Sequence, residues 1–355
     1  MTAFSTCILA WYDKHARVLP WRQPVGRGLP DSYAVWVSEI MLQQTRVETV
    51  IPYFERWLRQ FPTVQALADA PEQRVLSAWE GLGYYSRARN LHKAARLIVS
   101  EYGGQLPAEP AELRKLPGIG RYTASAIASI AFGLDVATLD GNLKRVFARV
   151  FDVSQPADSP AGEEILWALA ERHVPAGRAG DYNQALMDLG ATICLPKNPL
   201  CLLCPLNVLC KARALGIQEQ RPQMKPKPLV PHKLKGAAVI VRDGMTLLRQ
   251  RPADGLLGGL WEFPAAELDA DSPEALAAAI EAEYRLKVSP LARLTEVRHA
   301  YTHFKLTEIP WRCELLHLPA DAGLEWVPLD RLAEYPMGKV DRAIAKNVPN
   351  GGSLM

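Results

Sequence analysis

The sequence predicts an all-α domain followed by a smaller α+β domain. From Phe4 to Leu215 the apolar residues recur at helical spacing, as at Leu143, Val146 and Val150, and strand signals are nearly absent. Prolines interrupt this region where helices start, stop or kink, so we expect about ten short helices. Beyond residue 233 the apolar period changes to that of strands, and a chain of 355 residues fits two domains.

The two domains are joined by a stretch rich in proline and lysine. Residues 221–233 hold four Pro and three Lys, a composition that predicts an extended linker that does not pack. In the second domain the sequence predicts one helix, Ser272 to Tyr284, and several strands. The predicted strands are 237–241, 245–248 after an Asp243-Gly244 turn, and two further strands near 291–302 and 304–316. We therefore assign 1–215 to the helical domain, 216–233 to the linker, 234–345 to the second domain and 346–355 to a tail.

The composition excludes several classes of protein. With 48% hydrophobic and 22% charged residues, it is not that of a disordered, collagenous or coiled-coil chain. No apolar run is long enough to cross a membrane and residues 1–10 do not resemble a signal peptide, so we expect a cytoplasmic protein.

The positive net charge of +3 is concentrated in residues 195–231, which hold six Lys and Arg against one acidic residue. That segment is either a phosphate-contacting patch or a solvated basic linker.

Four cysteines gather in residues 194–210. Their spacing is Cys194-x6-Cys201-x2-Cys204-x5-Cys210, which lets four thiolates converge on one centre. One CxxC flanked by two single cysteines departs from the paired CxxC of zinc ribbons and favours an iron–sulfur cluster. Zinc and unliganded structural cysteines are the alternatives.

Residues 116–120, Leu-Pro-Gly-Ile-Gly, lie between two helical runs, 110–115 and 122–131. A Gly-x-Gly turn at Gly118 and Gly120 exposes backbone N–H groups at a helix start, where they bind a DNA phosphate without reading sequence. This pattern resembles a helix-hairpin-helix. The alternative is an ordinary helix–helix turn.

Asp140 follows about twenty residues later, just before the helical run 143–150. Taken alone, it is a helix N-cap. The order of hairpin, Asp140 and four-Cys loop on one helical domain nevertheless resembles the endonuclease-III superfamily of base-excision DNA glycosylases.

Three further segments narrow this resemblance to the MutY family of adenine DNA glycosylases. They are residues 19–22 (LPWR), 38–47 (SEIMLQQTRV) and 79–90 (WEGLGYYSRARN). The resemblance implies a monomeric, nucleoid-associated enzyme with a [4Fe–4S] cluster. It also implies a substrate, double-stranded DNA in which adenine is mispaired with 8-oxoguanine or guanine.

Two carboxyl groups carry the implied chemistry. Glu39 lies in the apolar run 35–42, where desolvation raises a carboxyl pKa toward the range of a general acid. By resemblance Glu39 protonates adenine N7 and Asp140 stabilises the oxocarbenium ion, as in a retaining glycosidase. A solvent-facing glutamate on a helix is the alternative for Glu39.

Tyr122 predicts where the reaction stops. Strand-cutting relatives carry a lysine at this position, which attacks the sugar and forms a Schiff base. A phenol cannot form an imine, so we expect a monofunctional enzyme that leaves an abasic site. Lys144, one turn past Asp140, is expected to be solvated or to contact phosphate.

The resemblance also assigns DNA contacts. Gln44 and Tyr84 match positions that enter the DNA stack, Leu42 adds an apolar wedge, and Gln184 faces the adenine edge. For Leu42 and Tyr84 the alternative is ordinary core packing. Weaker pocket candidates are Trp21, Arg22 and Asn142.

Residues 236–267 resemble the Nudix-like C-terminal domain of the same family. The helix near 274–284 lacks the Arg-Glu and Glu-Glu pairs that hold metal ions in a Nudix hydrolase, so we expect a lesion-reading module instead. Where the family carries Phe-Ser-His against 8-oxoguanine, this chain has Tyr301, Thr302 and His303, which keep the ring, the hydroxyl and the imidazole.

Three other functions fit parts of the sequence. A bifunctional endonuclease-III-type glycosylase/lyase would need a lysine in place of Tyr122. A non-catalytic iron–sulfur DNA-binding protein would have no use for both Glu39 and Asp140. A nucleotide pyrophosphatase would need the missing glutamate pairs.

Overall fold

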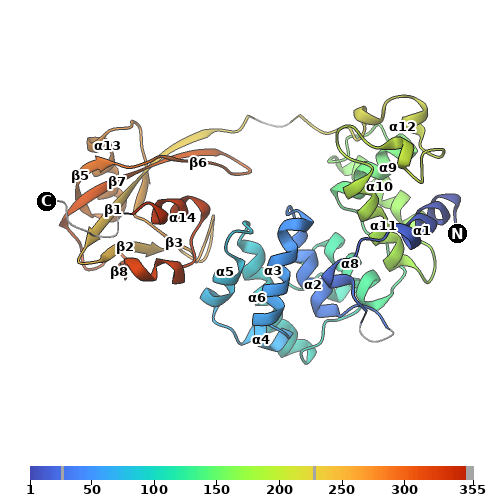
Figure 1. Ribbon diagram of the computed structural model, residues 1–355, viewed down its shortest axis with the longest axis horizontal. Helices are drawn as coiled ribbons and strands as arrows, with labels where there is room; N and C mark the ends of the chain where they lie inside the picture. The colour runs from blue at the N-terminus through green and yellow to red at the C-terminus, as the bar shows by residue number, and fades with distance from the viewer. Residues whose placement is uncertain (25–27, 227–228, 349–355) are drawn as a thin grey trace. The chain divides into compact units, whose positions relative to one another are not determined.

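The computed structural model describes residues 1–24, 28–226 and 229–348, and the chain divides into two compact units (Figure 1). Unit 1 comprises Met1–Asp69 and Asn90–Lys227, and unit 2 comprises Ala70–Arg89 and Pro228–Met355. Residues 70–89, which lie in the predicted helical domain, therefore group with the C-terminal residues. Positions 227–228 of the predicted linker and 349–355 of the predicted tail lie outside the described residues.

Helices build the first part of the chain, as predicted. They are α1 (Ala3–His15), α2 (Ser32–Leu42), α3 (Val47–Gln60), α4 (Val64–Ala68), α5 (Glu72–Trp79), α6 (Ser86–Tyr102), α7 (Pro110–Leu113), α8 (Arg121–Phe132), α9 (Gly141–Phe151), α10 (Pro160–Arg172), α11 (Ala179–Thr192) and α12 (Lys211–Ala214). Three short 3-10 helices accompany them: η1 (Pro20–Arg22), η2 (Cys201–Leu203) and η3 (Gln218–Gln220).

Local sequence signals explain where several helices begin and end. The Asp31 side chain caps α2 by accepting a hydrogen bond from Ala34 N, and Ser159 caps α10 directly before Pro160. Gly133 ends α8 in the left-handed conformation that glycine adopts without strain. These ends fix the lengths of the helices that carry the site.

One apolar core of unit 1 joins helices that are distant in sequence. Phe4 and Ile8 of α1 pack with Phe147 of α9, Trp167 of α10 and Tyr182 of α11. Burial of these side chains is the main driving force for packing α9 against α11. The first turn of α9 and the part of α11 from Gln184 onward contribute to the pocket described below.

Unit 2 contains a mixed sheet. Its strands are β1 (His232–Arg242), β2 (Met245–Gln250), β3 (Trp261–Glu262), β4 (Ala265–Glu267), β5 (Lys287–Arg293), β6 (Val297–Ala300), β7 (Lys305–His317) and β8 (Leu324–Pro328). The central order is β3-β2-β1-β7-β5, with β1 and β7 parallel. Helices α13 (Pro273–Tyr284) and α14 (Lys339–Lys346) and the 3-10 helix η4 (Leu329–Glu334) also belong to the unit, together with α5 and the start of α6 from residues 70–89.

The sheet lies between two apolar layers. Ala238 and Ile240 of β1 pack with Leu276 and Ile280 of α13, whereas the alternate residue Val239 packs into the cluster that contains α14. This alternation places the two helices on opposite faces, because successive strand side chains point to opposite sides. The predicted α+β character of the second domain is confirmed.

The structure adds two features that the sequence-based expectations lacked. Helix α14 was missed because it is only eight residues long and half of them are charged, although Val340 and Ile344 are both buried on it. The predicted linker is also more ordered than its composition suggests: Gln223 O accepts from Ala157 N at 2.8 Å, and β1 already begins at His232. Backbone hydrogen bonds that composition cannot report therefore hold both ends of the predicted linker.

No helix in the described part of the chain is long and apolar enough to cross a membrane.

Candidate active site

A pocket of about 860 Å³ in unit 1 brings together nine of the residues singled out in the sequence. They come from η1, α2, the turn after it, α8, α9 and α11: Trp21, Arg22, Glu39, Leu42, Gln44, Tyr122, Asp140, Asn142 and Gln184. Segments separated by more than 140 residues thus contribute to one cavity.

Glu39 lies on the pocket wall, yet its residue surface is only 4% exposed. Helix α2 carries it among Val35, Trp36 and Ile40, all buried. Burial, with a smaller contribution from the charge of Asp140, raises the pKa of Glu39 to about 7. Close to neutral pH, Glu39 therefore exists in both the protonated and the charged form.

Tyr122 holds Glu39 in place. The Tyr122 hydroxyl donates a hydrogen bond of 2.8 Å to Glu39 Oε2, and this bond lowers the Glu39 pKa against the effect of burial. Burial raises the pKa of Tyr122 itself well above its ordinary value, so the phenol keeps its proton. The first turn of α8, directly after the Gly-x-Gly turn, positions this ring.

Asp140 is both an N-cap and a pocket residue. Its Oδ1 accepts from Leu143 N at 2.7 Å at the start of α9, and its Oδ2 accepts from Asn142 Nδ2 at 3.2 Å. Burial raises its pKa, while these two donors lower it. Capping leaves the carboxyl facing the pocket, so the two sequence-based interpretations of Asp140 are compatible.

The sequence analysis did not identify Asp188, the buried carboxylate that pairs with Arg22. Asp188, whose side chain is fully buried, accepts from Arg22 Nη1 at 2.8 Å and from Arg17 Nη2 at 2.7 Å. The Arg22 charge lowers the pKa of Glu39. Asp188 lies four residues after Gln184 on α11, so helical spacing from Gln184 could have indicated that both face the same side.

The residues predicted to contact DNA differ in exposure. Gln44 is exposed and has a left-handed backbone with φ of 58°, in the turn between α2 and α3. Leu42, the last residue of α2, is half-buried, and Gln184 is buried within α11. Gln44 is thus available to a ligand, whereas Gln184 is available only inside the pocket.

The predicted hairpin joins α7 to α8. Gly118 has φ of +80°, and a Cβ there would lie 2.9 Å from the Asn90 Cβ, so both conformation and space require glycine. Gly120 is the N-cap of α8, and a Cβ there would meet nothing within 4 Å. The helix start is therefore open to an approaching phosphate.

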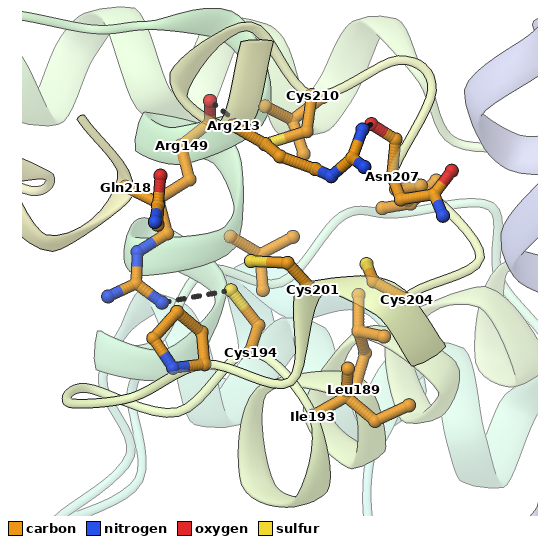
Figure 2. Close-up of a pocket in the computed structure, with 14 residues that line it drawn as sticks. Arg149, Leu189, Ile193, Cys194, Cys201, Cys204, Asn207, Cys210, Arg213 and Gln218 are labelled. Atoms are coloured by element: carbon orange, nitrogen blue, oxygen red, sulfur yellow. Dashed lines mark hydrogen bonds between the residues drawn. The ribbon is translucent and has the colours of Figure 1, made fainter. Parts of the chain in front are cut away.

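All four cysteines of the 194–210 loop line one small cavity (Figure 2). Burial, with smaller contributions from the neighbouring Cys194, Cys210 and Cys201, raises the pKa of Cys204 to about 12. In the described ranges, no three His, Cys, Asp or Glu side chains form a group that could hold a single metal ion. None of these four thiols is in a disulfide, so they are the residues available to hold a metal group here.

A buried arginine lies beside this cavity. Arg149 is 2% exposed, and its Nη1 donates to Cys194 Sγ at 3.3 Å (Figure 2). The same Nη1 donates to Leu195 O at 2.6 Å. A buried cation next to thiols fits a centre that carries negative charge. The chemistry of the donor set therefore fits a thiolate-bound cluster.

Helix α9 connects the two sites. Arg145 Nε donates to Cys194 O at 2.7 Å, and its Nη2 donates to Asn142 Oδ1 at 2.9 Å. Asn142 in turn donates to Asp140. Arg145 was not among the sequence-based candidates, although it lies on the same helix three residues after Asn142.

The remaining candidates lie elsewhere. Tyr84 and Thr302 belong to unit 2, both are exposed, and their hydroxyl oxygens are 3.0 Å apart in a hydrogen bond. His303 is exposed in the turn between β6 and β7. Lys144 forms an ion pair of 3.1 Å with Glu163, and this pair is compatible with the expectation of a solvated helix residue.

Two domain families and several known proteins match this chain. Residues 37–172 match the HhH-GPD superfamily of base excision DNA repair proteins, and residues 236–347 match the NUDIX domain. The adenine DNA glycosylase of Homo sapiens is 39% identical over 86% of this chain and 66% of its own length. That of Mus musculus is 37% identical over 92% of this chain and 74% of its own length.

Solved structures support the fold of the helical part. A thermostable thymine-DNA glycosylase matches with a TM-score of 0.54 and 30% identity, covering 60% of this chain and 95% of its own. An endonuclease III from a non-covalent DNA complex matches with a TM-score of 0.51 and 22% identity, over 61% of this chain and 95% of its own. The resemblance and the fold class drawn from the sequence are confirmed, and the chain belongs to the adenine DNA glycosylase family of DNA N-glycosylases.

Proposed function

We propose that this enzyme hydrolyses the N-glycosidic bond of adenine mispaired with 8-oxoguanine or guanine in double-stranded DNA, without cutting the strand. The observation that carries the proposal is the buried Glu39, bonded to Tyr122 and sharing its pocket with Asp140. A strand-cutting lyase and a non-catalytic DNA-binding protein are not favoured, because neither explains this set of residues.

Glu39 is the general acid. A carboxyl with a pKa of about 7 keeps its proton on a substantial fraction of molecules at neutral pH and gives it up readily to adenine N7. Protonation turns the base into a leaving group. The hydrogen bond from Tyr122 fixes the Glu39 carboxyl, so the proton is delivered from a defined position.

Asp140 stabilises the charge that develops on deoxyribose as the bond breaks. Its carboxylate is already oriented by Leu143 N and Asn142, so it need not reorganise during the reaction. Asn142 acts as a positioning residue for Asp140, and Arg145 holds Asn142 from the other side.

The reaction ends at an abasic site. Tyr122 occupies the position from which a lysine would attack the sugar, and a buried phenol that keeps its proton is a poor nucleophile. Lys144, the other amine considered as a nucleophile, forms an ion pair with Glu163.

DNA contacts come from two kinds of residue. The backbone at Gly118 and Gly120 binds phosphate, while Gln44 and Leu42 fill the space that the extruded adenine leaves in the stack. Gln184, Arg22 and Trp21 line the base pocket.

Unit 2 reads the lesion through Tyr84 and Thr302, with His303 beside them. The hydrogen bond between the two hydroxyls supports this role, because it joins two candidates that are 218 residues apart in sequence. In functional terms, residues 1–215 form the glycosylase domain, and residues 234–345, after a linker at 216–233, form the lesion-recognition domain.

Cys194, Cys201, Cys204 and Cys210 hold a [4Fe–4S] cluster. Its support is the shared cavity, the four-thiol donor set and the neighbouring Arg149 cation. When bound, the cluster fixes the loop that carries these residues. We further propose that the enzyme acts as a monomer in the cytoplasm, on DNA.

One experiment tests the substrate. Single-turnover reactions are run on duplexes that carry adenine opposite each of 8-oxoguanine, guanine, cytosine and thymine, with and without alkali. Excision opposite 8-oxoguanine and guanine, with strand breaks only after alkali, supports the proposal. Equal excision in all four duplexes, or strand breaks without alkali, overturns it.

A further inference from the structure

The turn that presents Tyr84 has an unusual backbone. Gly81 has φ of 99°, Gly83 has φ of 77° and Tyr84 has φ of 49°. A tyrosine rarely adopts this left-handed conformation, so the surrounding structure must hold it there.

Contacts within the turn provide part of this support. Trp79 Nε1 and Arg87 Nη2 each donate to Gly83 O at 3.1 Å. The Arg87 guanidinium also lies over the Tyr84 ring, 5.5 Å from its centroid. These contacts fix the turn internally but do not tie it to the strands that carry Thr302.

Glu80, directly before the turn, ties it instead to α14, which contacts β6. Its carboxylate accepts from Arg342 Nε at 2.5 Å and from Arg342 Nη2 at 2.9 Å, a bidentate pair, and from Met337 N at 3.3 Å. Arg342 lies on α14 and also donates to Tyr335 O at 2.6 Å and Leu332 O at 2.8 Å. Bidentate arginine–carboxylate pairs restrict geometry more than a single contact does.

A second tie lies on the other side of Tyr84. The Tyr85 hydroxyl donates to Met337 O at 3.1 Å, and Tyr85 is buried. Glu80 and Tyr85 therefore bracket the turn, and both are bonded to the segment that leads into α14.

We infer that the Glu80–Arg342 ion pair positions Tyr84 for reading the lesion. Neither residue of the pair contacts the base; they act through the Tyr84 turn as positioning residues. The inference rests on the proposed function, since it assumes that Tyr84 and Thr302 discriminate 8-oxoguanine from guanine.

The test uses the full chain and the ratio of single-turnover excision rates for adenine opposite 8-oxoguanine and opposite guanine, at one salt concentration. We expect Arg342→Met and Glu80→Gln each to lower this ratio about 5- to 10-fold, the size of one lost base contact. Glu80→Gln keeps the shape of the side chain, so it remains informative if Arg342→Met fails to fold. The matched control is Arg331→Met, which removes an exposed pair with Glu334 in the same unit and should leave the ratio unchanged.

A double-mutant cycle separates positioning from general destabilisation. If the pair acts through Tyr84, adding Arg342→Met to Tyr84→Ala lowers the ratio no further than Tyr84→Ala alone. Additive losses, or an unchanged ratio in Arg342→Met and Glu80→Gln while Tyr84→Ala lowers it, would overturn the inference and leave the proposed function intact. A wild-type enzyme that excises adenine equally opposite both bases would overturn both.

Discussion

Removing the Tyr122 hydroxyl should move the pH profile of catalysis. In Tyr122→Phe, Glu39 loses a hydrogen bond of 2.8 Å that stabilises its charged form, so its pKa should rise above about 7. A hydrogen bond to a charged group contributes about 1.5–3 kcal/mol, and one pKa unit corresponds to about 1.4 kcal/mol, so we expect a rise of about 1–2 units.

The direction in which the rate changes with pH follows from the role of Glu39 as acid. Only the protonated form is active, so the wild-type rate should fall about tenfold per pH unit above pH 7. In Tyr122→Phe the start of this fall should shift to about pH 8–9. At the alkaline end the variant should therefore lose less of its own maximal rate than the wild type does.

Single-turnover excision with enzyme in excess, measured between pH 5.5 and 9.5 at constant ionic strength, provides the assay. Duplex binding is measured at each pH as a control, because phosphate contacts also respond to charge. An unchanged midpoint in Tyr122→Phe would refute the claim that this hydrogen bond sets the Glu39 pKa. A midpoint shifted to lower pH would refute that claim too, and a wild-type rate that does not fall above pH 7 would refute the assignment of Glu39 as acid.

Three further changes have defined outcomes. Asp140→Asn should slow excision at least a hundredfold while duplex binding is kept, since it removes charge stabilisation of the transition state; near-normal single-turnover rates would contradict this. Cys204→Ser should lower the iron and sulfide content of the purified protein, which for the wild type should be close to four of each per chain; a colourless wild type that contains zinc would contradict the cluster. Glu308 is buried on β7, and burial raises its pKa to about 7, so between pH 4.5 and about 7 the folded state binds more protons than the unfolded state and stability falls as the pH rises. Glu308→Gln should therefore raise the unfolding free energy at pH 8 by about 1–3 kcal/mol and have little effect at pH 4.5, as measured by urea unfolding.

Sequence reasoning could predict the parts of the site that depend on local spacing. The Gly118 turn, the N-cap at Asp140 and the four-cysteine loop are each contained in a short segment, so periodicity and capping signals sufficed. The apolar run around Glu39 likewise predicted the direction of its pKa shift, because burial dominates that shift.

The rest depends on contacts that bring distant residues together. Asp188 holds Arg22 across 166 residues, and Glu80 meets Arg342 across 262, so no local pattern indicates either pair. The same holds for the predicted linker, because its proline-rich composition does not reveal that Gln223 O bonds to Ala157 N.

The central claim, that buried Glu39 donates the proton that releases adenine, is tested most directly by Glu39→Gln. The amide keeps the size of the side chain and can still contact Tyr122, but it cannot deliver a proton. Single-turnover excision of adenine opposite 8-oxoguanine should fall by at least about a thousandfold at pH 7, with duplex affinity within a few-fold of the wild type. Excision by Glu39→Gln within tenfold of the wild-type rate would contradict the account.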